Sequence, residues 1–480
     1  MGLKLHVALL CLAVSCVEAL RSQIRTPNGT ESDELENLTP NRKKLMHDAR
    51  RKELVDAGSP VEKPKVEHEV CTLGDGEDCK LSGLPRGKLS FVHPGGETRC
   101  LNGDPYYFEV YPGDSDKLLL FFDGGGACWS ESLYTMSVCR RDILHNEPWI
   151  GYFNPCTKGA VQNPFRNYTA IRINYCSGDV HLGHKDLRWK TASSSGKKFQ
   201  AVHRGYLNAK AAVDWAKANL APELSNFALT GTSAGVIGVQ VWASSLLQDF
   251  KYQKAAIVLD AWMNIVPKGF DSLVLQEWDA CDTPLFMRPS MRESRSACKT
   301  GSLTMKMMFD SFAGAHPKVP IAQINSQYDN VQRFYNDLIA SETQLSSLPP
   351  LACGKEKGNC GDEGSLEGMA PERYFELLRG VVEDRSQHPS YAVFLLSSAV
   401  HSGCFQTFGD CDAPGWTGPE ATREEVQRWL TTMVEGPWPV PSVCEDTPYL
   451  GLPSCPQPLH GRLFDPAAAA QHGSAQHGSA

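Results

Sequence analysis

Short apolar segments alternate along the chain with segments whose apolar residues follow helical spacing. Between Cys71 and about Phe464 the apolar segments are rich in β-branched and aromatic residues and end at turn signals, which predicts strands. Alternating strands and helices are typical of βαβ units, so we expect an α/β fold with a mostly parallel central sheet flanked by helices. The predicted strands are 117–123, 168–175, 227–231, 255–261, 319–326 and 391–399, and the clearest helices are 204–220 and 236–250.

The two ends of the chain depart from this pattern. In residues 1–19 a lysine precedes a short apolar stretch and small residues, which predicts a secretory signal peptide cleaved near Ala19. Residues 20–70 are polar and lack aromatic side chains, so we expect a disordered spacer, with a processed pro-segment or a surface-binding tail as alternatives. Residues 465–480 are a low-complexity tail, which leaves 71–464 as the folded domain. No later segment has the ~18 apolar residues of a membrane span.

Cysteines are numerous: the chain has 17, and 15 remain once the two in the predicted signal peptide are removed. Their scatter through an exported chain, without a CxxC pair, indicates disulfide bonds rather than a zinc site. The odd number leaves at least one thiol over or paired with another chain. Near neighbours are the candidate pairs: Cys71 with Cys79, Cys353 with Cys360, and Cys404 with Cys411.

The net charge of the chain indicates which classes of partner we do not expect. The formal net charge is −8, and we find no nucleic-acid-binding motif, so we expect no nucleic-acid partner. Hydrophobic residues make up 41% and charged residues 21%, as in ordinary globular domains. We expect a secreted, extracellular monomer without a stable membrane span.

A serine stands between two glycines where a predicted strand meets a predicted helix. The segment GTSAG, residues 231–235, fits the G-x-S-x-G pattern, and the strand before it and the helix after it are the context that a nucleophile elbow requires. The alternative is a glycine-rich turn that only lets the helix pack close to the sheet. Ser233 is therefore the candidate nucleophile.

A serine hydroxyl needs an adjacent base, and in elbow-bearing α/β folds the chain order is serine, acid, histidine. His401 directly follows the strand 391–399, whereas His316 and His388 precede strands and His460 lies past the last clear one. Two aspartates follow intervening strands. Asp329 lies on the last strand before the histidine strand and is our candidate acid; Asp260, one strand earlier, is the alternative.

A glycine run follows an early strand, in FFDGGGACW. Successive glycines let the backbone approach a ligand and direct amides inward, as an oxyanion hole requires, and the amide after the nucleophile, Ala234, completes such a site. A phosphate-binding loop is the alternative, but the run has neither the lysine of a P-loop nor the spacing of a dinucleotide fingerprint.

The ordered set of these segments resembles the pectin acetylesterase family. The likeness spans roughly Cys71 to Val440 and is carried by CLNGDPYYFEVYPGDSDKLLLFFDGGGACW, NPFRNYTAIRINYCSGDVHLG, GTSAG, INSQYD and AVHSGCF. The resemblance implies an α/β-hydrolase-like, disulfide-stabilised fold and metal-free hydrolysis of carboxylic esters. It also implies a disulfide at Cys176, because family members are rich in cysteine there.

The resemblance also assigns site residues. Carried over by position, the family nucleophile, acid and histidine fall on Ser233, Asp329 and His401, and the oxyanion amides fall on Gly125, Gly126 and Ala234. One departure concerns the glycine run: many plant members read GGGWC, whereas this chain reads GGGACW. Because Ala127 and Trp129 differ from the residues of those plant members, the resemblance does not predict the shape of the acyl pocket.

The segment YCSGDVHLGHK contains Asp179, His181 and His184 and raises a metal site as an alternative. The spacing D-x-H-x-x-H in a loop is not a strong ligand signature, so we expect structural or substrate-lining roles. We expect neither a metal nor another cofactor.

Taken together, the sequence predicts a secreted serine ester hydrolase acting through an acyl-enzyme. The family resemblance favours acetyl groups on a cell-wall polysaccharide such as pectin as the substrate, and a longer acyl chain is the alternative. A non-catalytic binding protein on the same scaffold and a serine peptidase are the rival hypotheses. Acyl length depends on pocket depth, so a shallow pocket beside Ser233 would favour acetyl and a deep apolar one a longer chain.

Overall fold

The computed structural model of the chain describes residues 68–73, 79–135, 138–143, 163–192, 196, 198–345, 369–399, 401, 420–436 and 438–445. All of these fall within one unit, Val66–Ala480. The predicted signal peptide, nearly all of the predicted spacer, the C-terminal tail and two candidate disulfides (353–360 and 404–411) lie outside the described residues. The strand β1 begins at His68, shortly before the predicted domain start at Cys71, and the domain limits stay a prediction.

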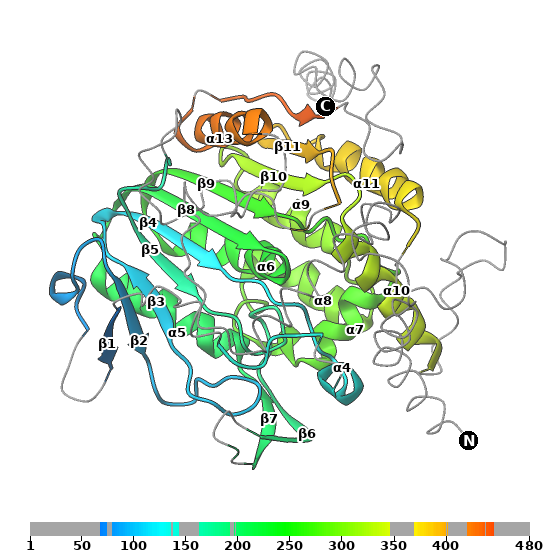
Figure 1. The fold of residues 1–480 in the computed structure, drawn as a ribbon, viewed down its shortest axis with the longest axis horizontal. Coiled ribbons are helices and arrows are strands. Elements are labelled where there is room, and N and C mark those ends of the chain that lie inside the picture. The colour runs from blue at the N-terminus through cyan, green and yellow to red at the C-terminus, as the bar shows by residue number, and fades with distance from the viewer. Residues whose placement is uncertain are drawn as a thin grey trace, which may run out of the picture. The chain divides into compact units, whose positions relative to one another are not determined.

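A ten-stranded sheet forms the centre of the fold, with the order β1-β2-β3-β5-β4-β8-β9-β10-β11-β12 (Figure 1). Only β3 runs against its two neighbours, so the sheet is mostly parallel, as predicted. The strands are β1 His68–Thr72, β2 Leu89–His93, β3 Phe108–Tyr111, β4 Asp114–Phe122, β5 Tyr168–Ile173, β8 Leu224–Thr232, β9 Tyr252–Asp260, β10 Ile321–Ser326, β11 Tyr391–Leu396 and β12 Val443–Cys444. A separate antiparallel hairpin consists of β6 Lys185–Ala192 and β7 Lys198–His203.

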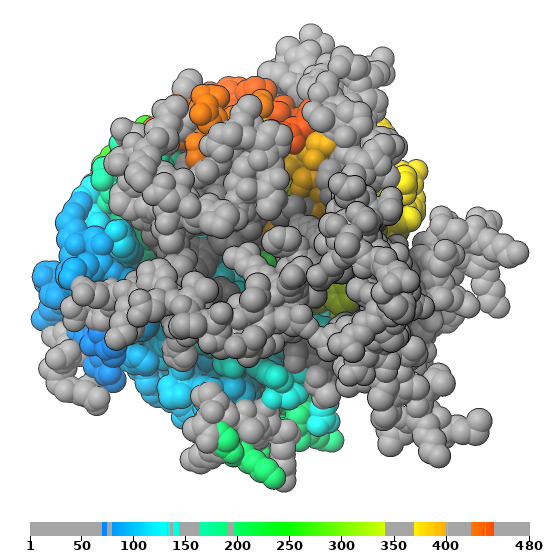
Figure 2. All heavy atoms as spheres, in the orientation of Figure 1, coloured from blue at the N-terminus to red at the C-terminus, as the bar shows by residue number. Residues whose placement is uncertain are grey.

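Helices connect the strands. The α-helices are α4 Glu131–Thr135, α5 Gly205–Asn219, α6 Ala234–Asp249, α7 Phe270–Glu277, α8 Arg292–Thr300, α9 Met305–Ala315, α10 Asn330–Leu345, α11 Pro371–Arg385 and α13 Glu420–Glu435. Short 3-10 turns lie at Leu81–Gly83, Ala280–Asp282 and Pro289–Met291. In the space-filling view, α13 (orange) and α11 (yellow) reach the surface on the face shown (Figure 2).

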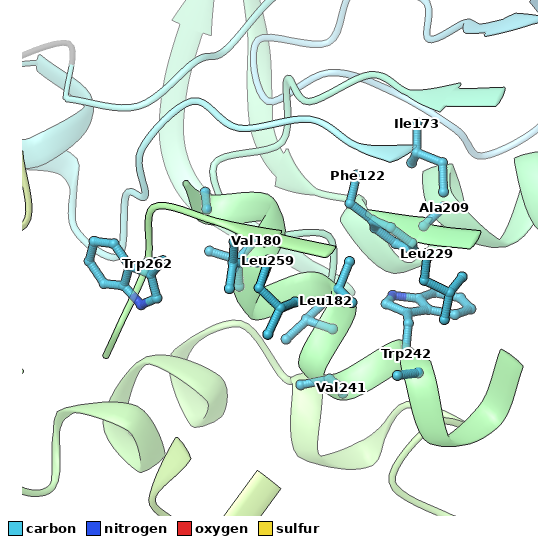
Figure 3. Packing of buried hydrophobic residues seen from close by; sticks show 14 of the residues in the cluster. Phe122, Ile173, Val180, Leu182, Ala209, Leu229, Val241, Trp242, Leu259 and Trp262 are labelled. Atoms are coloured by element: carbon cyan, nitrogen blue, oxygen red, sulfur yellow. The ribbon is translucent and has the colours of Figure 1, made fainter. Parts of the chain in front are cut away.

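The central strands bury both faces, which explains why they read as continuous apolar runs rather than alternating ones. Along β4, Leu118, Leu120 and Phe122 join the core that contains α5 and α6, whereas Leu119 and Phe121 join the core under α13. Figure 3 shows the first of these cores, with Phe122 close to Trp242 of α6. The fold is an α/β-hydrolase-like sheet with helices on both faces.

Four disulfide bonds join described cysteines: Cys71–Cys79, Cys100–Cys176, Cys128–Cys139 and Cys281–Cys298. The first confirms a predicted pair, and the second confirms that Cys176 is bonded. Disulfides persist in oxidising compartments, so these four are typical of an extracellular protein.

Candidate active site

Ser233 lies at the sharp turn between β8 and α6. Its backbone has φ 52° and ψ −121°, a combination that is strained for a residue with a side chain. The Ser233 N–H donates to the carbonyl of Asp260 at 2.9 Å, and its own carbonyl accepts from Val236 at 3.0 Å. Both bonds hold the strained turn, which is the geometry of a nucleophile elbow.

The two glycines of the elbow are required by close approach. A Cβ on Gly231 would lie 2.5 Å from the carbonyl oxygen of Gly235, and a Cβ on Gly235 would lie 2.0 Å from the carbonyl oxygen of Phe122 on β4. Either contact is too short for real carbon atoms. The pattern predicted from the sequence therefore has a steric cause: the helix begins directly against the sheet.

Asp329 and His401 lie at the same edge of the sheet, because they follow the neighbouring strands β10 and β11. The Nδ1 atom of His401 lies 2.9 Å and 2.8 Å from the two carboxylate oxygens of Asp329. The structure therefore brings together the acid and the histidine that the sequence nominated.

The Asp329 carboxylate is fully buried and is satisfied by the first turn of α10. Its Oδ1 accepts from the N–H groups of Val331 at 3.0 Å and Gln332 at 2.9 Å, and its Oδ2 accepts from Nε2 of Gln332 at 2.9 Å. These donors fix the orientation of the carboxylate. Gln332 had no role in the sequence prediction, although its position three residues after the acid, at a helix start, is a usable signal.

His401 is oriented by this carboxylate. Burial lowers the pKa of His401, but the charge of Asp329, its hydrogen bond and the charge of Asp260 together outweigh burial and raise the pKa above its usual value. With Nδ1–H donating to Asp329, Nε2 carries the lone pair that can accept a proton. Among the described residues, Nε2 of His401 is buried and has no hydrogen-bond partner.

Asp260, the alternative acid, lies at the end of β9 and is also fully buried. Its backbone carbonyl holds the Ser233 N–H, and its charge is the smallest of the effects that raise the pKa of His401. The contact of His401 with Asp329 is direct, so the geometry favours Asp329 as the orienting acid.

The glycine loop after β4 passes directly beside the elbow. A Cβ on Gly124 would lie 2.8 Å from Cβ of Ser233, and Gly126 has φ +73° and would place a Cβ 2.0 Å from the carbonyl oxygen of Val138. Gly126 and Ala234 line the pocket at Ser233. Gly125 is not among the residues that line this pocket, and its carbonyl accepts from the N–H of Arg140 at 2.7 Å.

A buried ion cluster anchors this loop. Asp123, at the start of the glycine run, pairs with Arg172 of β5 at 2.7 Å and with Arg140 at 3.1 Å, and Arg172 also pairs with Glu109 of β3 at 3.3 Å. The second oxygen of Asp123 accepts from the N–H of Gly124 at 2.9 Å. Sequence reasoning missed this cluster, because Asp123, Arg172 and Glu109 come together only when β3, β4 and β5 assemble in the sheet.

An apolar pocket lies beside Ser233 and has a cavity volume of about 40 Å³. Its walls come from the glycine loop, the loop after β9, helix α7 and helix α10. Ala127 and Trp129, which the sequence singled out, both line it. The remaining large apolar side chains of the lining are Val180, Ile237, Trp262, Val266, Phe270, Val274, Leu275, Trp278, Met305, Tyr335 and Ile339.

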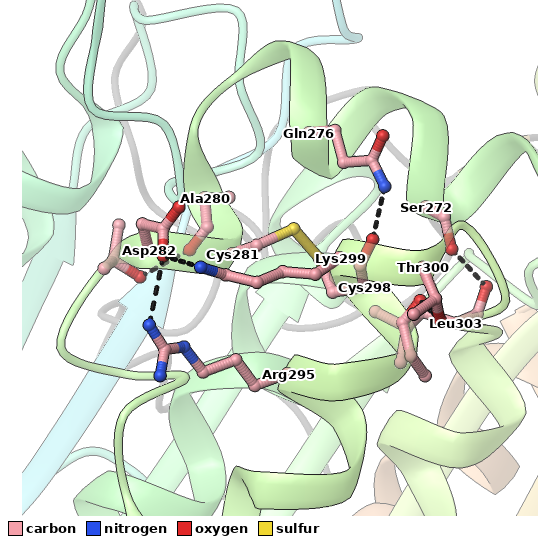
Figure 4. The surroundings of a disulfide bond; sticks show 12 residues. Ser272, Gln276, Ala280, Cys281, Asp282, Arg295, Cys298, Lys299, Thr300 and Leu303 are labelled. Carbon is pink, nitrogen blue, oxygen red and sulfur yellow. Dashed lines mark hydrogen bonds and ion pairs between the residues drawn. A yellow bond between two sulfur atoms is a disulfide. The ribbon is translucent and has the colours of Figure 1, made fainter.

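Helix α7 forms one wall of this pocket, and a disulfide bond links the turn after this helix to α8 (Figure 4). The Cys281–Cys298 bond joins the turn after α7 to α8, and Gln276 Nε2 of α7 donates to the carbonyl of Cys298. Ser272 of α7 donates to the carbonyl of Leu303 at 3.1 Å. The apolar spacing of Phe270, Val274 and Leu275 is a helical signal that the sequence analysis left without a role.

The residues that raised the metal alternative, Asp179, His181 and His184, make hydrogen bonds within the fold. The Asp179 carboxylate is buried and accepts from Ser177 Oγ at 2.5 Å and from the N–H of Gly205 at 2.8 Å. His181 Nε2 lies 2.7 Å from the carbonyl of Asp123, and the backbone N–H of His184 donates to the carbonyl of Trp278 at 2.9 Å. Within the described ranges, no group of three or more His, Cys, Asp or Glu residues is arranged to hold a metal ion.

Asp271 is a polar member of the apolar pocket. Burial raises the pKa of Asp271 to about 7, and the hydrogen bond from the N–H of Met305, 2.9 Å away, lowers it by less. The folded state binds the carboxyl proton of Asp271 more tightly than the unfolded state does. The free energy of unfolding therefore falls as the pH rises from the unfolded pKa near 3.8 to about 7.

Replacing Asp271 with Asn is therefore expected to raise the melting temperature more at about pH 8 than at about pH 5, by roughly 2–6 °C. Differential scanning calorimetry at one scan rate measures this. Asp214 of α5, an exposed carboxylate changed to Asn in the same way, is the control for removing one carboxylate at the surface. Equal shifts for Asp271→Asn would contradict the assignment.

No helix of the described ranges is long and apolar enough to cross a membrane.

Comparison with known proteins places the chain among ester hydrolases. The sequence model of a protein family described as Pectinacetylesterase matches residues 87–445. None of the curated protein sequences matches the chain. Two crystal forms of the Wnt deacylase Notum from Drosophila are similar in structure. Form I has 16% sequence identity and a TM-score of 0.45, and the match covers 67% of this chain and 87% of the Notum chain. Form II has 15% sequence identity and a TM-score of 0.43, and the match covers 65% of this chain and 85% of the Notum chain.

Proposed function

Because the chain belongs to the pectinacetylesterase family and is an ester hydrolase, we propose that Ser233 is its nucleophile, with His401 as the base and Asp329 as the acid that orients it. The observation that supports these roles is the pair of short contacts between Nδ1 of His401 and the Asp329 carboxylate, beside a strained serine at the same sheet edge. A non-catalytic scaffold would not need this arrangement.

In the proposed reaction, Ser233 Oγ attacks the ester carbonyl carbon and its proton moves to Nε2 of His401. The carbonyl oxygen becomes an oxyanion, which the N–H groups of Gly126 and Ala234 stabilise, with Gly125 as a further candidate donor. Collapse breaks the ester bond, and His401 returns the proton to the leaving alcohol. Water, deprotonated by His401, then releases the acyl group as a carboxylic acid.

The lining of the pocket indicates the length of the acyl group that it favours. An acetyl group has only a methyl to bury, whereas the wall beside Ser233 presents Trp129, Phe270 and Leu275. Each buried methylene contributes about 0.8 kcal/mol, so an acyl chain a few carbons longer than acetyl gains more from contact with this apolar lining. We therefore propose an acyl chain longer than acetyl as the better substrate. Acetyl groups on a polysaccharide such as pectin are the second candidate, which the family assignment favours.

A series of aryl esters from acetyl to dodecanoyl tests this choice. We expect kcat/KM to rise by roughly fourfold per added methylene until the pocket is filled. Val274→Trp should fill the pocket, lower kcat/KM for octanoyl by at least about tenfold, and leave acetyl within about twofold, so acetyl is the internal control. An optimum at acetyl, together with acetate release from acetylated pectin, would reject the longer chain and favour the second candidate.

A further inference from the structure

Two buried side chains of the segment 175–181 bond to carbonyl groups of the glycine loop after β4. The Tyr175 hydroxyl donates to the carbonyl of Gly126 at 2.7 Å. Nε2 of His181 lies 2.7 Å from the carbonyl of Asp123, at the start of the same loop. Both side chains are 1% exposed, and neither has a part in the reaction proposed above.

The direction of each hydrogen bond follows from its partners. The N–H of Val180 donates to the Tyr175 hydroxyl at 3.0 Å, and because an N–H cannot accept, the hydroxyl proton is left for the carbonyl of Gly126. A carbonyl oxygen only accepts, so Nε2 of His181 carries the proton of its ring. Burial lowers the pKa of His181, which keeps this ring neutral near pH 7.

Gly126 is held through the peptide groups on both of its sides. On the N-terminal side, the carbonyl of Gly125 accepts from the N–H of Arg140 at 2.7 Å. In a trans peptide the N–H points opposite to the carbonyl, so this bond directs the Gly126 N–H away from Arg140. On the C-terminal side, the Tyr175 hydroxyl fixes the carbonyl of Gly126 itself.

The direction of the Gly126 N–H is important because an oxyanion hole acts through donors that are already aimed at the developing charge. Gly126 lines the pocket beside Ser233, and a glycine with φ +73° has little steric restraint of its own. Bonds from neighbouring groups must therefore fix its peptide groups.

We propose that Tyr175 and His181 are positioning residues for the oxyanion hole, which hold the glycine loop so that the Gly126 N–H faces the tetrahedral intermediate. This role belongs to the segment that raised a metal site as an alternative. The inference rests on the proposed function, in which Gly126 is an oxyanion donor.

The first test is Tyr175→Phe, which removes the donating hydroxyl and keeps the ring. We expect kcat for the preferred aryl ester to fall by about 30-fold and KM to stay within about twofold, because the oxyanion forms only after the substrate has bound. An alkyl trifluoromethyl ketone forms a tetrahedral adduct with an activated serine, and its inhibition constant should rise by about the same factor. Tyr168→Phe is the matched control, since Tyr168 is buried in the core under α13, and it should leave both values within about twofold.

His181 gives a second comparison, which does not depend on the folding of Tyr175→Phe. His181→Gln keeps an N–H donor at the end of the side chain, whereas His181→Met has a similar length and no donor. Both variants lose the ring, so the loss of packing is common to them. We expect kcat to be at least about fivefold higher in His181→Gln than in His181→Met. Melting temperatures check that each variant is folded at the assay temperature.

The outcomes separate this inference from the proposed function. If the native enzyme hydrolyses esters and Tyr175→Phe lowers only the melting temperature, with kcat and the ketone inhibition constant unchanged, the inference is wrong and the esterase assignment stands. Equal kcat values in His181→Gln and His181→Met would overturn the role of His181. A native protein that neither hydrolyses esters nor binds the ketone would overturn the proposed function and this inference together.

Discussion

Replacing Ser233 with Ala is expected to lower kcat/KM for the preferred aryl ester by about 10⁶-fold, to the rate of the uncatalysed background plus any residual effect of binding. The reason is that the hydroxyl at the strained elbow is the only proposed nucleophile, and the oxyanion donors and His401 cannot replace it. Steady-state rates with purified proteins, compared at equal active concentrations, measure the loss.

Ser245 provides a matched control. It lies on α6, the same helix that follows the elbow, and its buried hydroxyl has no partner within the described ranges. Ser245→Ala should therefore keep kcat/KM within about twofold. If Ser233→Ala retained more than a few per cent of activity while remaining folded, Ser233 would not be the nucleophile.

Replacing Asp329 with Asn is expected to lower kcat by about 10⁴-fold, because the amide no longer holds His401 in the tautomer that leaves Nε2 free to accept a proton. Asp329 also supplies the largest effect that raises the pKa of His401, so its loss should lower that pKa.

The pH profile adds a second readout. The base must be neutral, so activity of the native enzyme should rise as the pH increases through the pKa of His401, which lies above the usual 6.5. In Asp329→Asn the residual activity should rise at a lower pH.

Asp260→Asn is the comparison that distinguishes the two aspartates. The charge of Asp260 is the smallest of the effects that raise the pKa of His401, so for Asp260→Asn we expect a loss of less than about tenfold and a smaller downward shift of the pH profile. Melting temperatures of both variants check that each is folded, since both carboxylates are buried. Activity that survives in Asp329→Asn but is lost in Asp260→Asn would reverse the assignment.

Much of the fold was predictable because the central strands are buried on both faces and read as apolar runs. The segment 227–231 lies within β8, and the predicted helix 204–220 corresponds to α5, Gly205–Asn219. The antiparallel β3 and the hairpin β6–β7 were not predicted. The pairing of β3 with β5 depends on a partner distant in sequence, and Phe108–Tyr111 is too short for periodicity to identify it.

The residues of the candidate site likewise differ in whether the sequence could predict them. Residues at strand ends, such as Ser233, Asp329 and His401, could be nominated because a parallel sheet collects them at one edge. Neighbours that meet only in three dimensions could not: Arg172 joins Asp123 across two strands, and Asn264 and Asp271 enter one cavity from different elements.

The most direct test of the account is covalent labelling with an alkyl fluorophosphonate, which reacts with an activated serine and leaves a stable adduct. Peptide mass spectrometry after incubation identifies the labelled residue. We expect one adduct per chain, on Ser233, with labelling lost in Ser233→Ala and strongly slowed in Asp329→Asn. A label on another residue that persists in Ser233→Ala, or no label on an enzyme that hydrolyses esters, would contradict it.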